Sequence, residues 1–206
     1  VVTSIKVCFP VPKLKILYFL KGPKVMEQKT PVEVPIEDMK HPLEHAWSFW
    51  MFTNDKKKWE DNLVELTTFD TVEDYWCLYH YMKSPSELTM GQDYMIFKKG
   101  IQPMWEDAAN RRGGRWLISL EKRKGEMDRM WLDVVLLMIG ENFEHNDDVC
   151  GVVVNIRGKC KIAVWTADAS NHKAYMEIGR KIKDALGPYA KLSYQHHNSS
   201  KNIHTM

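Results

Sequence analysis

Alternating hydrophobic and polar positions along the chain predict a series of short β-strands. These segments recur from residue 47 to residue 196, and turns containing glycine, proline or lysine separate them. The predicted strands are 47–52, 63–68, 93–98, 115–120, 149–157, 161–166 and 192–196. Only the short basic turn Arg157-Gly-Lys-Cys160 separates two of them, so these two are expected to pair as a β-hairpin.

Three other segments have the spacing of amphipathic helices, and they cover about residues 70–82, 128–140 and 172–186. The first begins with a capping signal, because Asp70 can cap the helix and Glu73 can complete a capping box. Gly187-Pro188 ends the last one. Strands that follow one another with helices interposed predict an α+β fold, in which one curved, mostly antiparallel sheet carries helices on one face.

Residues 1–40 show neither period and hold most of the prolines, which predicts a flexible or loosely docked N-terminal segment. Residues 41–206 are then expected to form one binding domain. The apolar run from Ile5 to Leu20 is interrupted by prolines and lysines, so no membrane span is expected there.

Two of the predicted helices carry more apolar surface than one buried stripe requires. In the first, Leu78 and Tyr81 extend a stripe formed by Val72, Tyr75, Trp76 and Tyr79. The segment with Leu132 and Leu136 is apolar nearly all round. Either both helices are deeply buried, or these side chains face outward to receive a helix of another protein. Periodicity alone favours neither interpretation.

The composition of the chain limits the classes of function that it can serve. The formal net charge is only +2, so any contact with nucleic acid must come from a local basic cluster. Eight tryptophans in 206 residues make an aromatic binding site worth seeking. The sequence has no glycine-rich phosphate loop, no His-Glu-x-x-His motif, no Cys/His metal cluster and no nucleophile elbow. An enzyme is therefore the less favoured class, and neither a cofactor nor a metal is expected.

The best candidate chemistry is a slot for a flat, positively charged base. Trp59 is predicted to lie in a basic polar loop, and Trp105 lies in a long loop directly before Glu106. Either indole alone could be a lid over the core, but two can stack on one base, and a cationic ring binds them more tightly. The carboxylate could accept two hydrogen bonds from the N1–H and amino edge of guanine.

The hairpin turn adds the charge that such a ligand would need. Arg157, Lys159 and Lys161 place three positive charges within five residues, and odd positions of a strand project to one side. Arginine can bind a phosphate through two hydrogen bonds, and lysine acts as a point charge. A solvated turn is the alternative, but together with the indoles and the acid the turn fits a guanine that carries a short phosphate chain.

Several unusual segments in one order resemble the eukaryotic translation initiation factor 4E family, which binds the cap of mRNA. The resemblance covers about residues 40–196. It is carried by His41-Pro-Leu43, Trp47 with Trp50, Phe69-Asp-Thr-Val-Glu-Asp-Tyr-Trp76, Pro103-Met-Trp-Glu-Asp107, Gly113-Gly-Arg-Trp-Leu117, Asp128-Arg-Met-Trp-Leu132 and Asp148-Val-Cys-Gly-Val-Val-Val-Asn-Ile-Arg157.

This resemblance implies an eight-stranded curved sheet with three helices on its convex face and a cap-binding slot on the concave side. It implies that Trp59 and Trp105 sandwich 7-methylguanine, that Glu106 reads its edge and that Trp165 lies near the methyl group. It also implies that the cap phosphates are bound by Arg157, Lys159, Lys161 and Arg115. The hairpin turn is one residue shorter than the common form, so either lysine or both could reach phosphate.

The resemblance further implies two kinds of protein partner, the scaffold factor 4G and 4E-binding repressors, each docking a helix on the convex face. The matching residues are His41, Pro42, Val72, Trp76, Leu132, Asp133 and Leu136. The implied protein is a monomer that joins a complex in the cytoplasm, with the nucleus and RNA granules as further compartments. The segment after His196 is shortened relative to the family, which indicates a divergent paralogue. A cap-binding repressor that recruits no scaffold, and an enzyme acting on capped nucleotides, are the alternatives.

Overall fold

The computed structural model describes residues 40–55, 58–119, 124–197, 199 and 201–206. Within these residues the chain forms an eight-stranded antiparallel sheet of order β2-β1-β3-β5-β6-β4-β7-β8. The strands are β1 (Pro42–Phe52), β2 (Leu63–Thr71), β3 (Asp93–Lys98), β4 (Gly114–Ser119), β5 (Val149–Asn155), β6 (Lys161–Thr166), β7 (Lys191–His196) and β8 (His204–Thr205).

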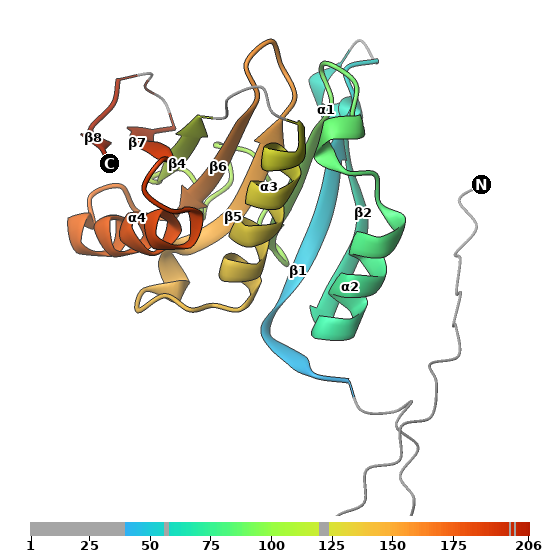
Figure 1. Ribbon diagram of the computed structural model, residues 1–206, viewed down its shortest axis with the longest axis horizontal. Coiled ribbons are helices and arrows are strands. Elements are labelled where there is room, and N and C mark those ends of the chain that lie inside the picture. Colours follow the sequence, from blue (N-terminus) through green and yellow to red (C-terminus); the bar gives the residue numbers. More distant parts are fainter. Residues whose placement is uncertain (1–39, 56–57, 120–123, 198, 200) are drawn as a thin grey trace, which may run out of the picture. The chain divides into compact units, whose positions relative to one another are not determined.

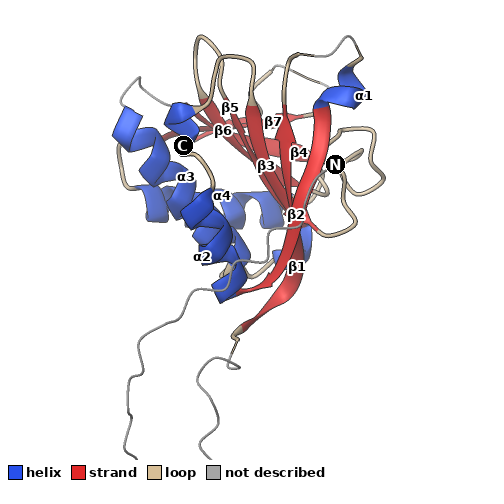
Figure 2. Ribbon diagram, turned by 90° about the vertical axis from the view of Figure 1, so that its right-hand side faces the viewer, coloured by secondary structure: helices blue, strands red, loops and turns tan. Residues whose placement is uncertain are grey.

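Helices α2 (Val72–Tyr81), α3 (Lys124–Ile139) and α4 (His172–Leu186) lie on the convex face of this curved sheet (Figures 1 and 2). The short helix α1 (Trp59–Asn62) and the 3-10 turns η2 (Pro85–Glu87) and η3 (Asn146–Asp148) lie in the connections. The predicted α+β architecture is therefore confirmed. None of the described helices has the length and apolar character needed to cross a membrane.

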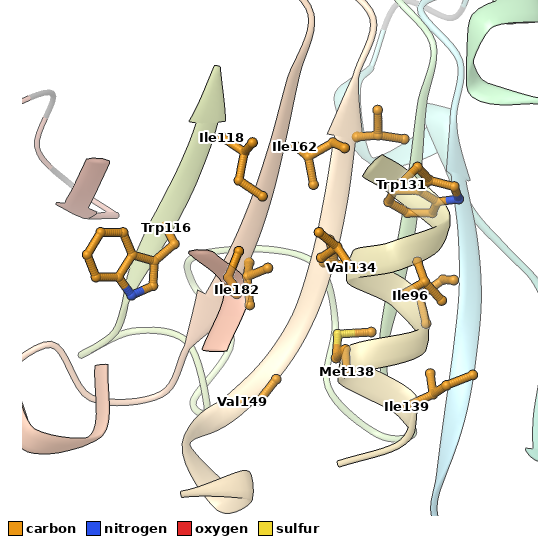
Figure 3. Packing of buried hydrophobic residues seen from close by; sticks show 14 of the residues in the cluster. Ile96, Trp116, Ile118, Trp131, Val134, Met138, Ile139, Val149, Ile162 and Ile182 are labelled. Atoms are coloured by element: carbon orange, nitrogen blue, oxygen red, sulfur yellow. The ribbon is translucent and has the colours of Figure 1, made fainter. Parts of the chain in front are cut away.

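The main core lies between the sheet and the helices, where alternate strand residues meet the apolar sides of α3 and α4 (Figure 3). Trp131 and Val135 of α3 and Trp116 of β4 are completely buried. The indole N–H of Trp116 donates to the carbonyl of Tyr175 at 2.7 Å. A Cβ at Gly179 would lie 2.4 Å from the Trp116 ring, so only glycine allows α4 to pack this closely.

A second, smaller cluster covers the opposite face of the same strands. Its buried members are Phe52, Met95, Phe97, Cys150, Val153, Ala163 and Trp165. Because strand side chains alternate between faces, Trp165 lies on this face while its neighbours Val164 and Thr166 do not share it. Burial raises the pKa of the Cys150 thiol to about 12, so this cysteine packs as a small hydrophobic side chain.

Several local predictions were wrong. The cap of α2 is Thr71, whose hydroxyl accepts from the Asp74 N–H at 3.1 Å, and not Asp70. Trp59 does not lie in an irregular loop but begins α1, and α3 begins at Lys124, before the predicted position 128. At α2 a local hydrogen bond sets the boundary, which a hydrophobic period cannot detect.

Two strands also differ from their predicted bounds. β5 ends at Asn155, so Arg157 lies in the turn and strand periodicity does not fix its side. β1 begins at Pro42 rather than at residue 47. The prediction for residues 1–40 falls outside the described residues, Lys40 apart.

Candidate functional site

Trp105 is presented by the loop between β3 and β4 with 54% of its surface exposed. The loop is held from beneath by the fully buried Asn110, whose amide donates to the carbonyls of Gln102 and Met104, each at 2.8 Å. The Asp107 carboxylate accepts from two backbone N–H groups of the same loop, those of Gln102 at 3.1 Å and Ala109 at 2.9 Å. The backbone that carries this exposed indole is thus held by polar contacts of Asn110 and Asp107.

The two neighbouring carboxylates of this loop have different environments. Asp107 bonds the backbone and holds the loop, whereas Glu106 is exposed beside Trp105. Of these two acids, Glu106 is the exposed one. The sequence motif contained both acids, but not the signal that Asp107 and Asn110 are structural.

Trp165 of β6 and Arg115 of β4 are paired across the sheet. Trp165 is 9% exposed, and it packs edge-on against Phe97 with ring centroids 5.4 Å apart. The Arg115 Nε lies buried and has no hydrogen-bond partner within the described residues. Burial lowers the pKa of its guanidinium. The pair combines an aromatic wall with a partly desolvated positive charge.

His197 closes this end of the site. Its ring lies 4.1 Å from the Trp165 ring, tilted by 44°. Burial, followed by the charges of Arg115 and His196, lowers the pKa of His197 to about 4, so the ring is neutral at neutral pH. A pocket of about 290 Å³ opens beside Trp105, lined by Arg111, Arg112, Gly113, His196 and His197.

The Asp93 carboxylate holds Arg157 in place, although no sequence pattern indicated this residue. Its two terminal nitrogens donate to the Asp93 oxygens at 2.6 and 2.8 Å, and one also donates to the Ile156 carbonyl at 3.0 Å. Asp93 also accepts the backbone N–H of Ile156 at 3.2 Å. Burial raises the pKa of Asp93 and outweighs the opposing effect of Arg157. The ion pair therefore orients the Arg157 side chain but contributes little to the free energy of unfolding.

The bonds to Asp93 and Ile156 use three of the five guanidinium N–H groups of Arg157, and 44% of the side chain remains exposed. Lys159 and Lys161 are exposed in and after the same turn. Lys161 lies four residues before Trp165 on the same face of β6, about 13 Å away along the strand. The basic end and the aromatic end thus lie along one strand.

One of the predicted base contacts, Trp59, has a side chain outside the described part of the structure. Trp59 is the first residue of α1, but its side chain lies outside the described part. The predicted sandwich of two indoles therefore stays a prediction. Trp105, Glu106, Trp165 and the basic residues are placed as described above.

The convex face resolves the question that periodicity left open for α2. Val72 is 38% and Trp76 is 42% exposed, although both are large apolar side chains at the start and middle of a helix. Trp76 meets Tyr79 edge-on, with centroids 5.5 Å apart, and a pocket of about 520 Å³ extends beside it to Pro85. The outward interpretation is thus correct for α2.

In α3 the same question has a divided answer. Trp131 and Val135 are buried, while Leu132 and Leu136 are half-buried on the side that the resemblance assigned to a partner. Asp133 forms an ion pair with Arg129 at 3.5 Å across one helical turn. Pro42 is exposed and pairs with Thr71, the residue that caps α2, and His41 is also exposed.

A family model described as eukaryotic initiation factor 4E matches residues 42–205. The chain belongs to this family. It is 54% identical over 166 residues to eukaryotic translation initiation factor 4E1 of Drosophila melanogaster, covering 78% of this chain and 64% of the relative. It is 50% identical over 180 residues to eukaryotic translation initiation factor 4E of Xenopus laevis, covering 83% and 84%.

Solved structures of the initiation factor 4E family agree with this assignment. Ascaris suum eIF4E-3, in complex with the m7G cap, is 40% identical, has a TM-score of 0.78, and covers 82% of this chain and 98% of its own. Caenorhabditis elegans eIF4E-3, in complex with the 4E-binding protein Mextli and a cap analogue, is 39% identical with a TM-score of 0.77, covering 82% and 100%.

Proposed function

We propose that this chain binds the 7-methylguanosine cap of mRNA and, on its convex face, a helix of a translation-initiation partner. The observation that supports the first part is the exposure of Trp105. This residue directly precedes Glu106, and its loop is held by Asn110. In this proposal Trp105 shares one ligand site with Trp165 and with Arg157, which Asp93 holds in place. The m7G cap in the related Ascaris structure supports the same ligand class.

In this proposal the methylated base stacks between Trp105 and Trp59, and its positive charge lies over the indoles. A desolvated cation over an indole gains about 2 kcal/mol, which unmethylated guanine would not obtain. Glu106 accepts the N1–H and amino groups of guanine. Trp165 contacts the methyl group, and Arg157, Lys159, Lys161 and Arg115 bind the phosphates.

The decisive measurement is a calorimetric titration of the full chain with 7-methyl-GTP and with GTP. We expect Trp105→Ala to weaken 7-methyl-GTP binding by at least about 2 kcal/mol, which is roughly 30-fold in Kd. Trp76→Ala removes another exposed tryptophan, which lies on the other face, and should leave the titration unchanged. Equal affinity of the wild-type chain for GTP and 7-methyl-GTP would refute the cation-stacking proposal.

The second part rests on four apolar side chains of the convex face. Val72 and Trp76 of α2 are exposed, and Leu132 and Leu136 of α3 are half-buried. We propose that they receive a helix with a Tyr-x-x-x-x-Leu motif, as found in scaffold factor 4G and in 4E-binding repressors. His41, Pro42 and Asp133 complete the proposed contact set. The Mextli complex of the related nematode protein supports a 4E-binding partner of this kind.

A peptide titration tests the second part with the same two variants in reversed roles. Trp76→Ala should abolish binding of a scaffold peptide, and Trp105→Ala should not affect it. A chain that binds a repressor peptide but no scaffold peptide would instead support the alternative of a cap-binding repressor. We propose a monomeric binding protein, not an enzyme, that acts in the cytoplasm with further pools in the nucleus and RNA granules, which imaging of a tagged chain would test.

A further inference from the structure

Two histidines that are far apart in sequence meet at the edge of the sheet that carries β8. His172 is the first residue of α4, and His204 is the first residue of β8. Their Nε2 atoms lie 3.0 Å apart, and their ring centroids lie 5.1 Å apart with the planes at 74°. His172 is exposed and His204 is half-buried, so solvent reaches the pair.

Both imidazoles rest on a rigid aromatic support. The rings of Tyr175 and Tyr194 stack at 4.1 Å with only 7° between their planes. His172 meets Tyr175 at 5.1 Å, and His204 meets the same ring at 5.7 Å. The backbones are fixed as well, since Asn171 caps α4 and His204 pairs with Tyr194 in the sheet.

This geometry places two nitrogen donors at nearly the spacing that a metal ion requires. Two imidazolium rings would repel at this distance, so at least one Nε2 must present a lone pair to the other. A tetrahedral Zn²⁺ with bonds of about 2.0–2.1 Å separates two ligand nitrogens by roughly 3.3 Å. The observed separation differs by a few tenths of an ångström, which a small rotation of either side chain supplies.

We propose that His172 and His204 form a two-histidine site for a divalent transition-metal ion such as Zn²⁺ or Ni²⁺. Among the described residues no cluster of three or more His, Cys, Asp or Glu side chains could hold a metal, so solvent completes the coordination of this one. Neutral imidazole is a common ligand for both ions. The site is independent of the proposed cap and partner contacts, because neither histidine belongs to them.

The metal would link α4 to β8, and this metal-mediated link is called the clasp below. β8 has two residues at the sheet edge, and its surroundings are held by hydrogen bonds from Ile203 N–H to the Tyr194 carbonyl at 2.8 Å and from Met206 N–H to the Leu192 carbonyl at 2.9 Å. A bond from the metal to each histidine ties this short strand to a helix. Ion binding to the folded state alone would also raise the melting temperature.

Calorimetric titration of the full chain with Zn²⁺, and separately with Ni²⁺, tests the proposal. We expect one binding event that weakens at least 10-fold in His172→Gln and in His204→Gln. It should be retained in His80→Gln, which removes an exposed histidine from α2. An isotherm that is unchanged in either of the first two variants would overturn the site, as would its loss in His80→Gln.

Hydrogen exchange provides a second readout that does not depend on the His204 variant folding well. Zn²⁺ should slow exchange of the Ile203 and Met206 amides in the wild-type chain and leave them unchanged in His172→Gln. At a zinc concentration 100-fold above Kd, the melting temperature should rise by roughly 5 °C or more in the wild-type chain only. Zinc binding without slower exchange would overturn the clasp.

Discussion

Replacing Asp93 with asparagine tests whether a buried carboxylate prepares Arg157 for a phosphate. Asp93 is 3% exposed and holds two guanidinium nitrogens at 2.6 and 2.8 Å. Asparagine keeps the size and one acceptor oxygen but removes the charge and the second acceptor. Arg157 would then regain rotamer freedom in the unliganded protein, and a phosphate would have to order it again on binding.

Two known magnitudes bound the expected loss of binding free energy. Ordering an arginine side chain costs up to about 2 kcal/mol, and a hydrogen bond to a charged group is worth about 1.5–3 kcal/mol. Because asparagine still accepts one bond, we expect Asp93→Asn to lose about 1–2 kcal/mol of 7-methyl-GTP binding, which is roughly 5- to 30-fold in Kd. Binding of 7-methylguanosine without phosphates should be unchanged.

Calorimetry with both ligands on one set of variants isolates the mechanism. Asp70→Asn removes the same charge from an exposed position of β2 and serves as the control. On an Arg157→Gln background, Asp93→Asn should cause no further loss of phosphate affinity if it acts through Arg157. An equal loss for the nucleoside and the triphosphate, or a full additional loss on the Arg157→Gln background, would refute the positioning role.

The same double variant makes a stability prediction. Arg157→Gln leaves a buried carboxylate without its charged partner, and such a loss typically costs about 3–5 kcal/mol. Because burial already raises the pKa of Asp93, part of that cost is relieved by protonation. Adding Asp93→Asn should therefore restore the free energy of unfolding toward the wild-type value, as measured by urea denaturation.

Two further predictions concern the aromatic end of the site. Asn110→Ala should lower the free energy of unfolding by roughly 1–3 kcal/mol, because it removes the donors to two loop carbonyls, and it should weaken cap binding, whereas exposed Gln102→Ala should do neither. His197 has a folded-state pKa lowered from 6.5 to about 4 by burial and by Arg115, so the unfolded chain binds more protons and stability should fall as the pH drops from about 6.5 to 4. His197→Phe should flatten that decline in a pH series of thermal melts, and an unchanged slope would contradict the assignment.

Local periodicity was sufficient to predict most of the sheet and the helices. The alternation in β4 and β6 predicted the strands that carry Arg115 and Trp165, and the turn residues between β5 and β6 predicted their hairpin. These signals work because side-chain direction repeats every two residues in a strand and every 3.6 in a helix. Trp105 was selected for a similar reason, because no apolar period surrounds it.

Contacts between distant residues could not be predicted in this way. Asp93 and Arg157 are 64 residues apart, and His172 and His204 are 32 residues apart, so each pair depends on the register of the sheet and not on spacing along the chain. Asn110 is similar on a smaller scale, because a polar residue in a polar loop gives no sign that it is completely buried.

The two proposed binding faces lie on opposite sides of the sheet, and the partner face is carried mainly by helices α2 and α3. In β6, Trp165 contributes to the cap face, and the adjacent Val164 and Ile162 lie in the core under the helices. Because this core is close-packed, a ligand on one face can influence the other only by moving strands that both share. Val164 and Ile162 are fully buried with Trp116 and Trp131, so such movement would be costly. Cap binding and partner binding are therefore expected to be nearly additive, and a strong coupling between them would have to arise outside the described sheet and helices.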